Sequence, residues 1–374
     1  MLLQRFSKTK VIPLEDCTGC SLCSNVCPQK CITMKEGKLG HLFPYVDNKN
    51  CIQCNLCVKT CPSNKDISLT YPLTAYAAWA KEKKEYVSSS SGGAASVLSH
   101  EIILRGGVVY GCSMSSECEV RHIRVEKAEE LYKLKGSKYV QSIIKDILPI
   151  LKEDIKQGRQ VLFIGTPCQV AAVKGLFKEI PDTLFLVDLV CHGVPSLKTL
   201  QEYLKTEFGT CVFDSISFRN GTKLSLVLNN KGVKMYEGSS RTDLYYKTFM
   251  EGYTYRDSCH HCKYAQPNRI SDITIGDFWG LGRMGDCDIP EHNEGISVML
   301  PLTEKGIALI QAVNDKFNIY DRPVEEAIKG NSQLMSPSLA GKRIRLFQRL
   351  EPLFGLKRAY RLSHLDIVMK NYLK

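Results

Sequence analysis

The stretch CTGCSLCSNVCP at residues 17–28 recurs as CIQCNLCVKTCP at residues 51–62. The four cysteines, one leucine and the final proline fall at the same places in both copies. Repetition of this kind indicates a duplicated structural unit. Residues 32–47 lie between the copies and predict a short hairpin that turns near Glu36 and Gly37.

Each copy has the spacing C-x-x-C-x-x-C-x-x-x-C-P. Three cysteines at this spacing wrap around one [4Fe-4S] cluster, and the fourth reaches the neighbouring cluster. The expected ligand sets are therefore crossed: Cys17, Cys20 and Cys23 with Cys61, and Cys51, Cys54 and Cys57 with Cys27. Zinc also binds C-x-x-C pairs. Two full copies, each with a fourth cysteine and a proline, favour two [4Fe-4S] clusters and a role in electron transfer.

The chain has 374 residues and 17 cysteines. Its first residues lack the apolar core of a signal peptide, and no run of about 18 apolar residues predicts a membrane span. We therefore expect a cytoplasmic protein. In that compartment, clustered cysteines bind metals more often than they form disulfides.

Behind the repeat, predicted strands and helices alternate. QVLFIG (160–165) and TLFLVDLV (183–190) are predicted buried strands, and CQVAAVKGLFKE (168–179) between them is a predicted helix. Continuous apolar strands on either side of a helix indicate a parallel βαβ unit. Residues 71–86 are interpreted as a bridging segment, and residues 139–155 as an amphipathic helix interrupted by Pro149.

Nine cysteines lie outside the two runs. Cys168 and Cys191 follow the two predicted strands, so a parallel sheet puts both at one edge, where open α/β sheets bind ligands. Cys259 and Cys262 form the loop C-H-H-C. These four could hold a third [4Fe-4S] cluster, and the alternative is a zinc site at 259–262 beside two unrelated buried cysteines. Buried apolar packing is expected for the rest: Cys31, Cys112, Cys118, Cys211 and Cys287.

Three glycine-rich turns could bind a ligand, although no G-x-G-x-x-G motif follows a strand. SSGGAAS (90–96) and KGSKYVQS (135–142) each precede a predicted helix, whose first N–H groups favour a phosphate. In the second turn, Lys135 and Lys138 offer positive charge. ITIGDFWG (273–280) lies at a strand end. Linker, helix cap and tight turn are the alternative interpretations.

The motifs follow one another in a recognisable order behind the two-cluster module: SSGGAAS, GGVVYGC, GSKYVQS, GTPCQVAAVKG, VDLVCHGVPS and CHHCKYAQPNRISDITIGDFWG. This series resembles the coenzyme F-420 hydrogenase/dehydrogenase beta subunit family over about residues 10–300. The resemblance implies a domain that binds FAD and one [4Fe-4S] cluster. It also implies electron transfer between reduced deazaflavin, or another acceptor, and iron–sulfur carriers.

The resemblance extends to individual positions. It makes Cys168, Cys191, Cys259 and Cys262 the ligands of the third cluster. It makes seven residues neighbours of FAD: Ser91, Gly92, Gly93, Ser137, Lys138, Tyr139 and Thr166. It identifies no catalytic acid or base and does not decide between deazaflavin and another organic substrate.

The formal net charge is +11. Three clusters and one flavin dinucleotide would remove about 8 charges and leave a nearly neutral protein. No helix-turn-helix or basic–aromatic array supports a nucleic-acid partner. The expected partners are a ferredoxin or another redox protein and a small organic electron donor or acceptor.

Together these features predict an α/β fold, α+β overall, in which a small bacterial-type 2×[4Fe-4S] ferredoxin module precedes a mixed α/β flavin-binding domain. The expected divisions are a ferredoxin domain (1–72), two parts of the flavin and iron–sulfur domain (73–200 and 201–330) and a basic helical tail (331–374). The predicted function is an iron–sulfur flavoprotein oxidoreductase. The alternative is an electron-relay subunit that docks on a partner through Lys342, Arg343, Arg345 and Arg349.

Overall fold

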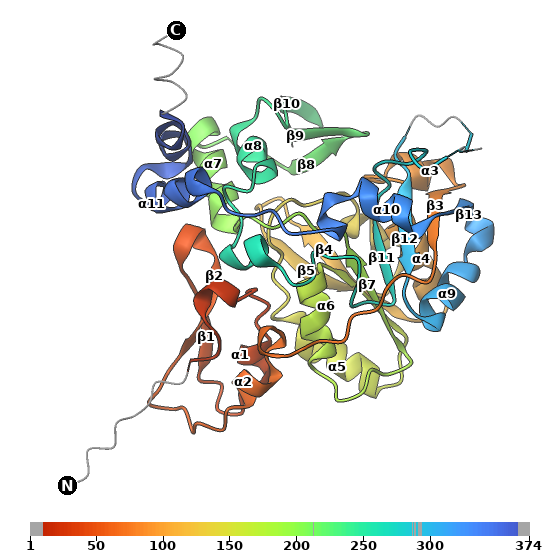
Figure 1. Ribbon diagram of the computed structural model, residues 1–374, viewed down its shortest axis with the longest axis horizontal. Helices are drawn as coiled ribbons and strands as arrows, with labels where there is room; N and C mark the ends of the chain where they lie inside the picture. The colour runs from red at the N-terminus through yellow and green to blue at the C-terminus, as the bar shows by residue number, and fades with distance from the viewer. Residues whose placement is uncertain (1–9, 212, 286, 288, 291–293, 366–374) are drawn as a thin grey trace.

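The computed structural model describes residues 10–365, apart from 212, 286, 288 and 291–293 (Figure 1). The N-terminal module contains helices α1 (Leu22–Val26) and α2 (Leu56–Thr60) and an antiparallel hairpin of β1 (Ile32–Glu36) and β2 (Leu42–Val46). Each short helix follows a residue with left-handed backbone, Ser21 at φ 63° and Asn55 at φ 58°. The sequence repeat is therefore also a repeat of backbone geometry, and the predicted hairpin is present.

The larger part of the chain is built on one sheet of eight strands in the order β13-β3-β12-β11-β7-β6-β4-β5. Strands β4, β6, β7 and β11 run parallel to one another, while β3, β5, β12 and β13 pair antiparallel with their neighbours. The prediction of a mixed α/β domain is confirmed. The strand bounds are β3 Ala75–Ala80, β4 Val108–Met114, β5 Val120–Val125, β6 Val161–Gly165, β7 Leu184–Leu189, β11 Ile273–Asp277, β12 Ser297–Pro301 and β13 Phe317–Arg322.

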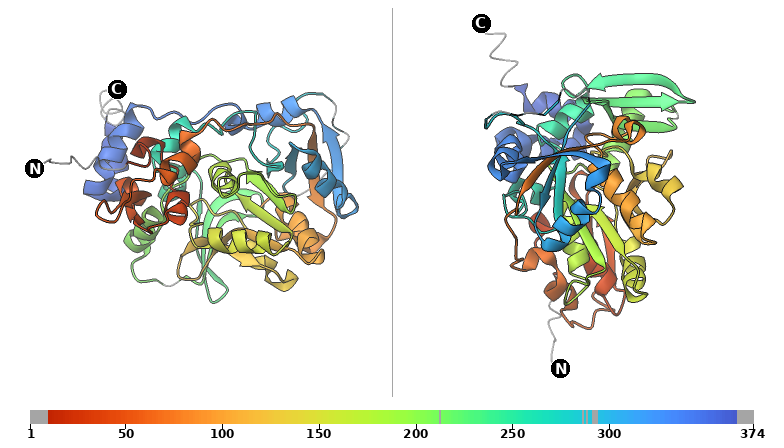
Figure 2. Two further views of the ribbon diagram at one scale, coloured as in Figure 1. Left: turned by 90° about the horizontal axis from the view of Figure 1, so that it is seen from below. Right: turned by 90° about the vertical axis from the view of Figure 1, so that its right-hand side faces the viewer.

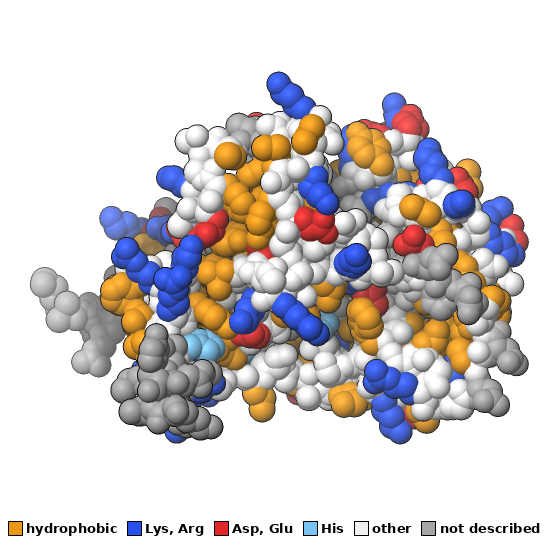
Figure 3. Space-filling model, turned by 90° about the horizontal axis from the view of Figure 1, so that it is seen from above, with side chains coloured by type: hydrophobic (Ala, Val, Ile, Leu, Met, Phe, Trp, Pro, Cys, Tyr) orange, Lys and Arg blue, Asp and Glu red, His pale blue; other side chains and the backbone are white. Residues whose placement is uncertain are grey.

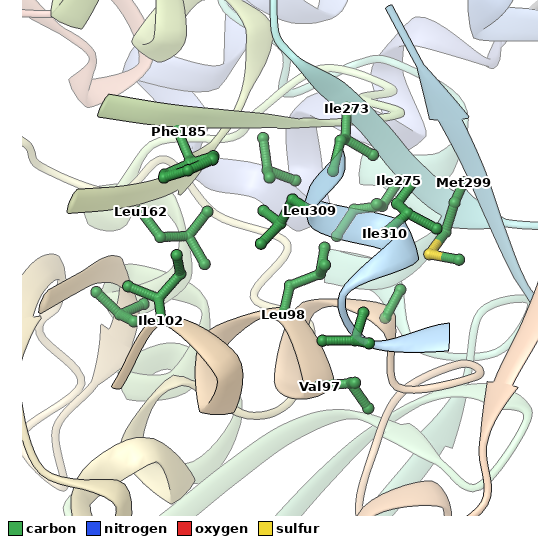
Figure 4. Close-up of a cluster of buried hydrophobic side chains, with 14 of the residues drawn as sticks. Val97, Leu98, Ile102, Leu162, Phe185, Ile273, Ile275, Met299, Leu309 and Ile310 are labelled. Atoms are coloured by element: carbon green, nitrogen blue, oxygen red, sulfur yellow. The ribbon is translucent and has the colours of Figure 1, made fainter. Parts of the chain in front are cut away.

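Helices cover both faces of this sheet. Helices α4 (Ala94–Leu104) and α9 (Glu304–Gln311) pack on one face, where Leu98 and Leu309 meet Leu162 and Met299 (Figure 4). Helices α5 (Ile147–Lys156), α6 (Pro167–Lys174) and α10 (Val324–Gly330) cover the other face. Because both faces are covered, the central strands are apolar along their whole length, as their sequences indicated.

A second, smaller core forms between the sheet and the C-terminal helix. It contains a three-stranded antiparallel sheet, which lies apart from the main sheet in Figure 2, and two helices. Its strands are β8 (Ser215–Asn220), β9 (Lys223–Asn230) and β10 (Val233–Ser239), and its helices are α7 (Leu197–Phe208) and α8 (Leu244–Met250). Helix α11 (Lys342–Ser363) packs Phe347 and Ala359 around Tyr253. Among the described residues, no helix is both long and apolar enough to cross a membrane.

Two local predictions are wrong. Residues 71–86 are not a simple bridge, because they contain the inner strand β3 and helix α3 (Lys83–Val87). The predicted helix over 139–155 begins only at Ile147, since the preceding backbone bonds to distant segments: Gln141 N–H donates to Pro195 O, and Ile143 O accepts from His122 N–H. Pro149 then lies in the first helical turn, where its missing N–H costs nothing.

The eight-stranded sheet also takes strands from both predicted parts of the larger domain. Strands β3 to β7 come from 73–200, and β11 to β13 come from 201–330. Strand β11 lies directly beside β7, with Ile273 opposite Val187. The two sequence ranges therefore share one sheet and one core.

The junction of β7 and β11 is fixed by a buried ion pair. Arg269 Nη2 lies 2.9 Å from Asp188 Oδ1, and both side chains are almost fully buried. The same guanidinium donates to the carbonyl of Tyr264 at 2.5 Å. Arg269 therefore ties the segment after the C-H-H-C loop to the centre of the sheet.

We expect Arg269→Met to lower the free energy of unfolding by about 3–5 kcal/mol, because it leaves the Asp188 carboxylate buried without its counter-charge. Anaerobic thermal and denaturant unfolding of the holoprotein would measure this. The matched control is Arg121→Met, which removes an exposed pair with Glu119 and should cost about 0–1 kcal/mol. Equal losses in the two variants would contradict the assignment.

Candidate functional site

The site is organised by the register of two parallel strands. Gly165, the last residue of β6, pairs with Asp188 of β7. Cys168 and Cys191 each lie three residues beyond this pair (165 + 3 and 188 + 3), so both reach the same edge of the sheet. This is the carboxyl edge of the parallel strands, where ligands of open α/β sheets bind.

The C-H-H-C loop reaches the same place from the other side. Cys259 lies in the short 3-10 helix Asp257–His261, and Cys262 caps its end. The two histidines between them face elsewhere: His260 Nδ1 lies 2.8 Å from Ser338 O, and His261 Nε2 lies 3.0 Å from Asp16 Oδ1. The loop therefore offers two sulfurs, rather than imidazoles, to the edge of the sheet.

The four thiols form one electrostatic group. Burial raises the pKa of Cys168 to about 12, and the charges of Cys191 and Cys262 contribute to the rise. Burial likewise raises the pKa of Cys191 to about 11, and the pKa of Cys259 responds to all three other thiols. Buried sulfurs that repel one another as thiolates need bound cationic iron or another metal to become charged.

The first ferredoxin set forms a similar group. The pKa of Cys20 rises to about 12 through burial, with further contributions from Cys61 and Cys17. Burial also raises the pKa of Cys23, and the charges of Cys20, Cys17 and Cys61 add to the effect. The thiol of Cys61, from the second sequence repeat, is therefore brought to the cysteines of the first, as the crossed ligand sets require.

The second set lines a pocket at the far end of the module, where Cys27 comes from the first repeat and the other three cysteines from the second: Cys51, Cys54 and Cys57. Cys54 is exposed, so this pocket lies near the surface. Within the described residues, no group of three or more His, Cys, Asp or Glu side chains is arranged to hold a single metal ion. A cubane cluster differs from a single ion because its four irons each bind one cysteine.

Cys31 is a functional candidate that the spacing did not identify. Its Sγ atom lies 3.5 Å from Cys27 Sγ, and the residue lines the same pocket. The second repeat has Lys65 at the corresponding position, so the repeat itself gave no signal. Of the other unassigned cysteines, Cys118 is buried as expected, whereas Cys211 is exposed, because it follows the end of α7.

Two of the glycine-rich turns meet at the edge of the sheet. The backbone N–H of Ser137 donates to Ser90 Oγ at 2.9 Å, which joins the turn at 135–138 to the turn at 88–93. Ser91 Oγ donates to Ile296 O at 2.9 Å, and Gly93 has φ 86° at the start of α4. The first turn therefore opens a helix and is not a flexible linker.

The positive charges of these turns are already engaged. The Lys138 ammonium donates to the carbonyls of Cys112, Leu134 and Lys135, which uses its three N–H donors. Lys135 lies 2.8 Å from the Glu85 carboxylate. The sequence offered both lysines as contacts for a phosphate, but in this geometry they hold the turn in shape.

Gly92 also has a packing role. A Cβ atom at Gly92 would lie 2.1 Å from the carbonyl oxygen of Ala78 and 2.6 Å from the backbone nitrogen of Ser297. The glycine is therefore required by the close approach of this turn to strands β3 and β12.

Thr166 and Tyr139 lie at the same edge. Thr166 caps α6, and its Oγ1 lies 3.2 Å from Cys168 Sγ. The Tyr139 hydroxyl accepts from Arg219 Nε at 2.9 Å, and Arg219 Nη2 lies 2.5 Å from Asp277 Oδ2. The sequence analysis did not identify Arg219, because the residues around an arginine do not indicate its tertiary partners.

His192 lies beside this polar chain. Burial lowers its pKa, and Arg219 lowers it too, while the Asp277 carboxylate opposes both. The edge therefore brings an imidazole, a guanidinium and a carboxylate next to the cysteine group.

Comparison with known families agrees with this geometry. Residues 158–327 match the family described as the C terminus of the coenzyme F420 hydrogenase/dehydrogenase beta subunit. Residues 16–65 match the 4Fe-4S dicluster domain. Each of these two segments matches its family. The resemblance that the motifs indicated is thus confirmed, and the chain is an iron–sulfur redox protein.

A solved structure has a similar fold. A chain of the F420-reducing [NiFe] hydrogenase complex from Methanosarcina barkeri, studied as a xenon derivative, is similar with a TM-score of 0.50 and 17% sequence identity. The similarity covers 83% of this chain and 96% of that chain. A comparison with curated proteins finds no match. This similarity concerns the fold, and the four cysteines at the edge of the sheet all lie within the matched residues 158–327.

We expect Cys259→Ser to reduce bound iron from about twelve to about eight atoms per chain, because it removes one of four ligands of a cubane cluster. Anaerobic reconstitution followed by iron and sulfide analysis would measure this. Cys211→Ser, at an exposed position outside all three sets, should retain the full iron content. Unchanged iron in Cys259→Ser would show that the four thiols hold no cluster.

Proposed function

We propose that this chain is an iron–sulfur flavoprotein oxidoreductase. It exchanges electrons with a ferredoxin or another redox protein at one end and with a deazaflavin-like or other organic molecule at the other. The carrying observation is that four cysteines from distant segments meet at the carboxyl edge of the sheet, beside the glycine-rich turns and next to the first set of ferredoxin cysteines.

When bound, [4Fe-4S] clusters supply one-electron steps and FAD supplies both one- and two-electron steps. The chain's own residues determine where these groups could be held. The first set of ferredoxin cysteines faces the third set, because Tyr264 interacts with cysteines of both. The second ferredoxin set, which contains the exposed Cys54, lies at the other end of the module. The module is therefore oriented with one pocket toward the surface and one cysteine set toward the sheet.

The proposal for FAD is supported by the turns at 88–93 and 135–138 and by Thr166 next to Cys168. Lys135 and Lys138 are engaged within the chain, and the Ser91 hydroxyl donates to Ile296 O. We therefore assign recognition of the dinucleotide to backbone N–H groups of the two turns and to Ser137, with Ser91 holding its turn in place. Lys138 and Tyr139 would support this site by fixing the conformation of the turn.

The test is anaerobic purification and reconstitution of the full chain, with iron, sulfide and flavin quantified. We expect about twelve irons and one FAD per chain. Reduction by dithionite should bleach the flavin, and an oxidised ferredoxin should restore its colour. A chain that takes up twelve irons but no FAD would be no flavoenzyme, and eight irons would mean that the third cluster is absent.

A relay subunit without its own substrate is the second candidate. It is motivated by the similar chain, which comes from a hydrogenase complex. Lys342, Arg345 and Arg349 are exposed on α11. Lys and Arg side chains also occur over much of the rest of the face drawn in Figure 3, so positive charge is not confined to one end of the molecule. We therefore favour the exposed pocket around Cys54 as the entry point for a redox partner.

Steady-state turnover distinguishes the two candidates. The oxidoreductase should oxidise or reduce a deazaflavin or another small organic molecule without further subunits. A relay should exchange electrons with a ferredoxin but turn over no small molecule, even when it contains its full set of cofactors.

A further inference from the structure

Arg256 is a buried positive charge that no carboxylate neutralises. The residue directly precedes the C-H-H-C helix and is 1% exposed. Its guanidinium donates to neutral acceptors: Cys17 O at 3.0 Å, Leu42 O at 2.8 Å and Gln141 Oε1 at 3.2 Å. Within the described part of the chain, it forms no ion pair. Burying an arginine in this way is costly unless a negative charge lies nearby.

The groups with the strongest electrostatic interaction with Arg256 are cysteines. They come from two different sets: Cys17 and Cys20 from the first ferredoxin set, and Cys168 and Cys259 from the third set. A [4Fe-4S] cluster with four thiolates carries a net charge of about −2. Two clusters, one on either side, would thus supply the missing counter-charge of Arg256.

Tyr264 lies between the same two sets. Its ring packs in a hydrophobic cluster with Leu22, Cys20 and Cys168, and its buried hydroxyl has no hydrogen-bond partner in the described structure. Its strongest charge interactions are with Cys168, Cys262, Cys20 and Cys61. The segment 256–264 therefore supplies a cation and a ring to the junction between the two cysteine sets.

We infer that Arg256 is a positioning residue that sets the reduction potentials of the two clusters at this junction. The inference rests on the proposed function, which supplies the third cluster. With clusters held by the Cys17 and Cys259 sets, transfer would move one electron from the first set to the second, oxidising the first cluster and reducing the second, with no bond or proton change. A fixed positive charge at the junction stabilises the added electron on either cluster.

The test is an EPR-monitored redox titration of the reconstituted full chain as wild type and as Arg256→Gln. We expect the equilibrium constants for reduction of the two junction clusters to fall about tenfold, a downward shift of about 59 mV for one electron. The far cluster, held by Cys27, Cys51, Cys54 and Cys57, should not shift. Arg256→Lys should restore most of the potential, because it retains the charge.

A second variant keeps the arginine in place. Gln141 Oε1 accepts from Arg256 Nε, so Gln141→Glu puts a carboxylate beside the guanidinium and offsets its charge. It should shift the same two potentials downward. The Cys259→Ser variant identifies which EPR signal belongs to the third cluster.

The outcomes separate this inference from the proposed function. If the wild-type protein binds only eight irons, the third cluster of the proposed function is absent. The potential of the cluster at Cys17 would then still test the role of Arg256. Equal shifts of all three clusters, no shift in either variant, or loss of iron in both Arg256→Gln and Gln141→Glu would overturn the inference. Those results would make Arg256 a purely structural residue.

Discussion

The pairing of Gly165 with Asp188 is the constraint on which the site depends. Strands in a parallel pair run in the same direction, so residues equally far beyond a paired position emerge at the same edge. This register alone brings Cys168 and Cys191 together, although 22 residues separate them in the chain. A shift of one residue would turn every side chain of β7 to the opposite face of the sheet. The apolar faces of β6 and β7, buried under helices on both sides, prevent that shift.

Two buried arginines then connect the C-H-H-C loop to the rest of the molecule. Arg269 pairs with a carboxylate inside the sheet, and its charge is compensated by protein alone. Among the described residues, Arg256 donates to neutral acceptors and forms no ion pair, and it faces thiols from two cysteine sets. The contrast is chemically informative, because a buried charge without a protein counter-charge favours an anionic occupant nearby. The burial of Arg269 is explained by its ion pair within the fold, and the burial of Arg256 by the clusters that the fold would hold.

The ferredoxin module is packed directly against the larger domain. Leu22 is fully buried among residues of α5 and α6, and its side chain fills the space beside Gly175. Ser258 Oγ and Arg256 both donate to the carbonyl of Cys17, which follows the first turn of the module. Cysteine sets from the two domains thus face each other across packed side chains.

By itself, the sequence determined the iron–sulfur character of the protein and much of its local structure. The repeated cysteine spacing predicted the dicluster module and its crossed sets, and the apolar runs at 160–165 and 183–190 predicted parallel strands, because these signals depend only on residues close in the chain. Tertiary structure alone decided what depends on distant partners. Residues 139–146 are not helical because they bond to β5 and to Pro195, and Lys138 is not a free charge because three carbonyls surround it. Tertiary contacts likewise brought three further residues to the candidate site: Cys31, Arg219 and Arg256. No local sequence pattern indicates which buried neighbour a side chain will contact.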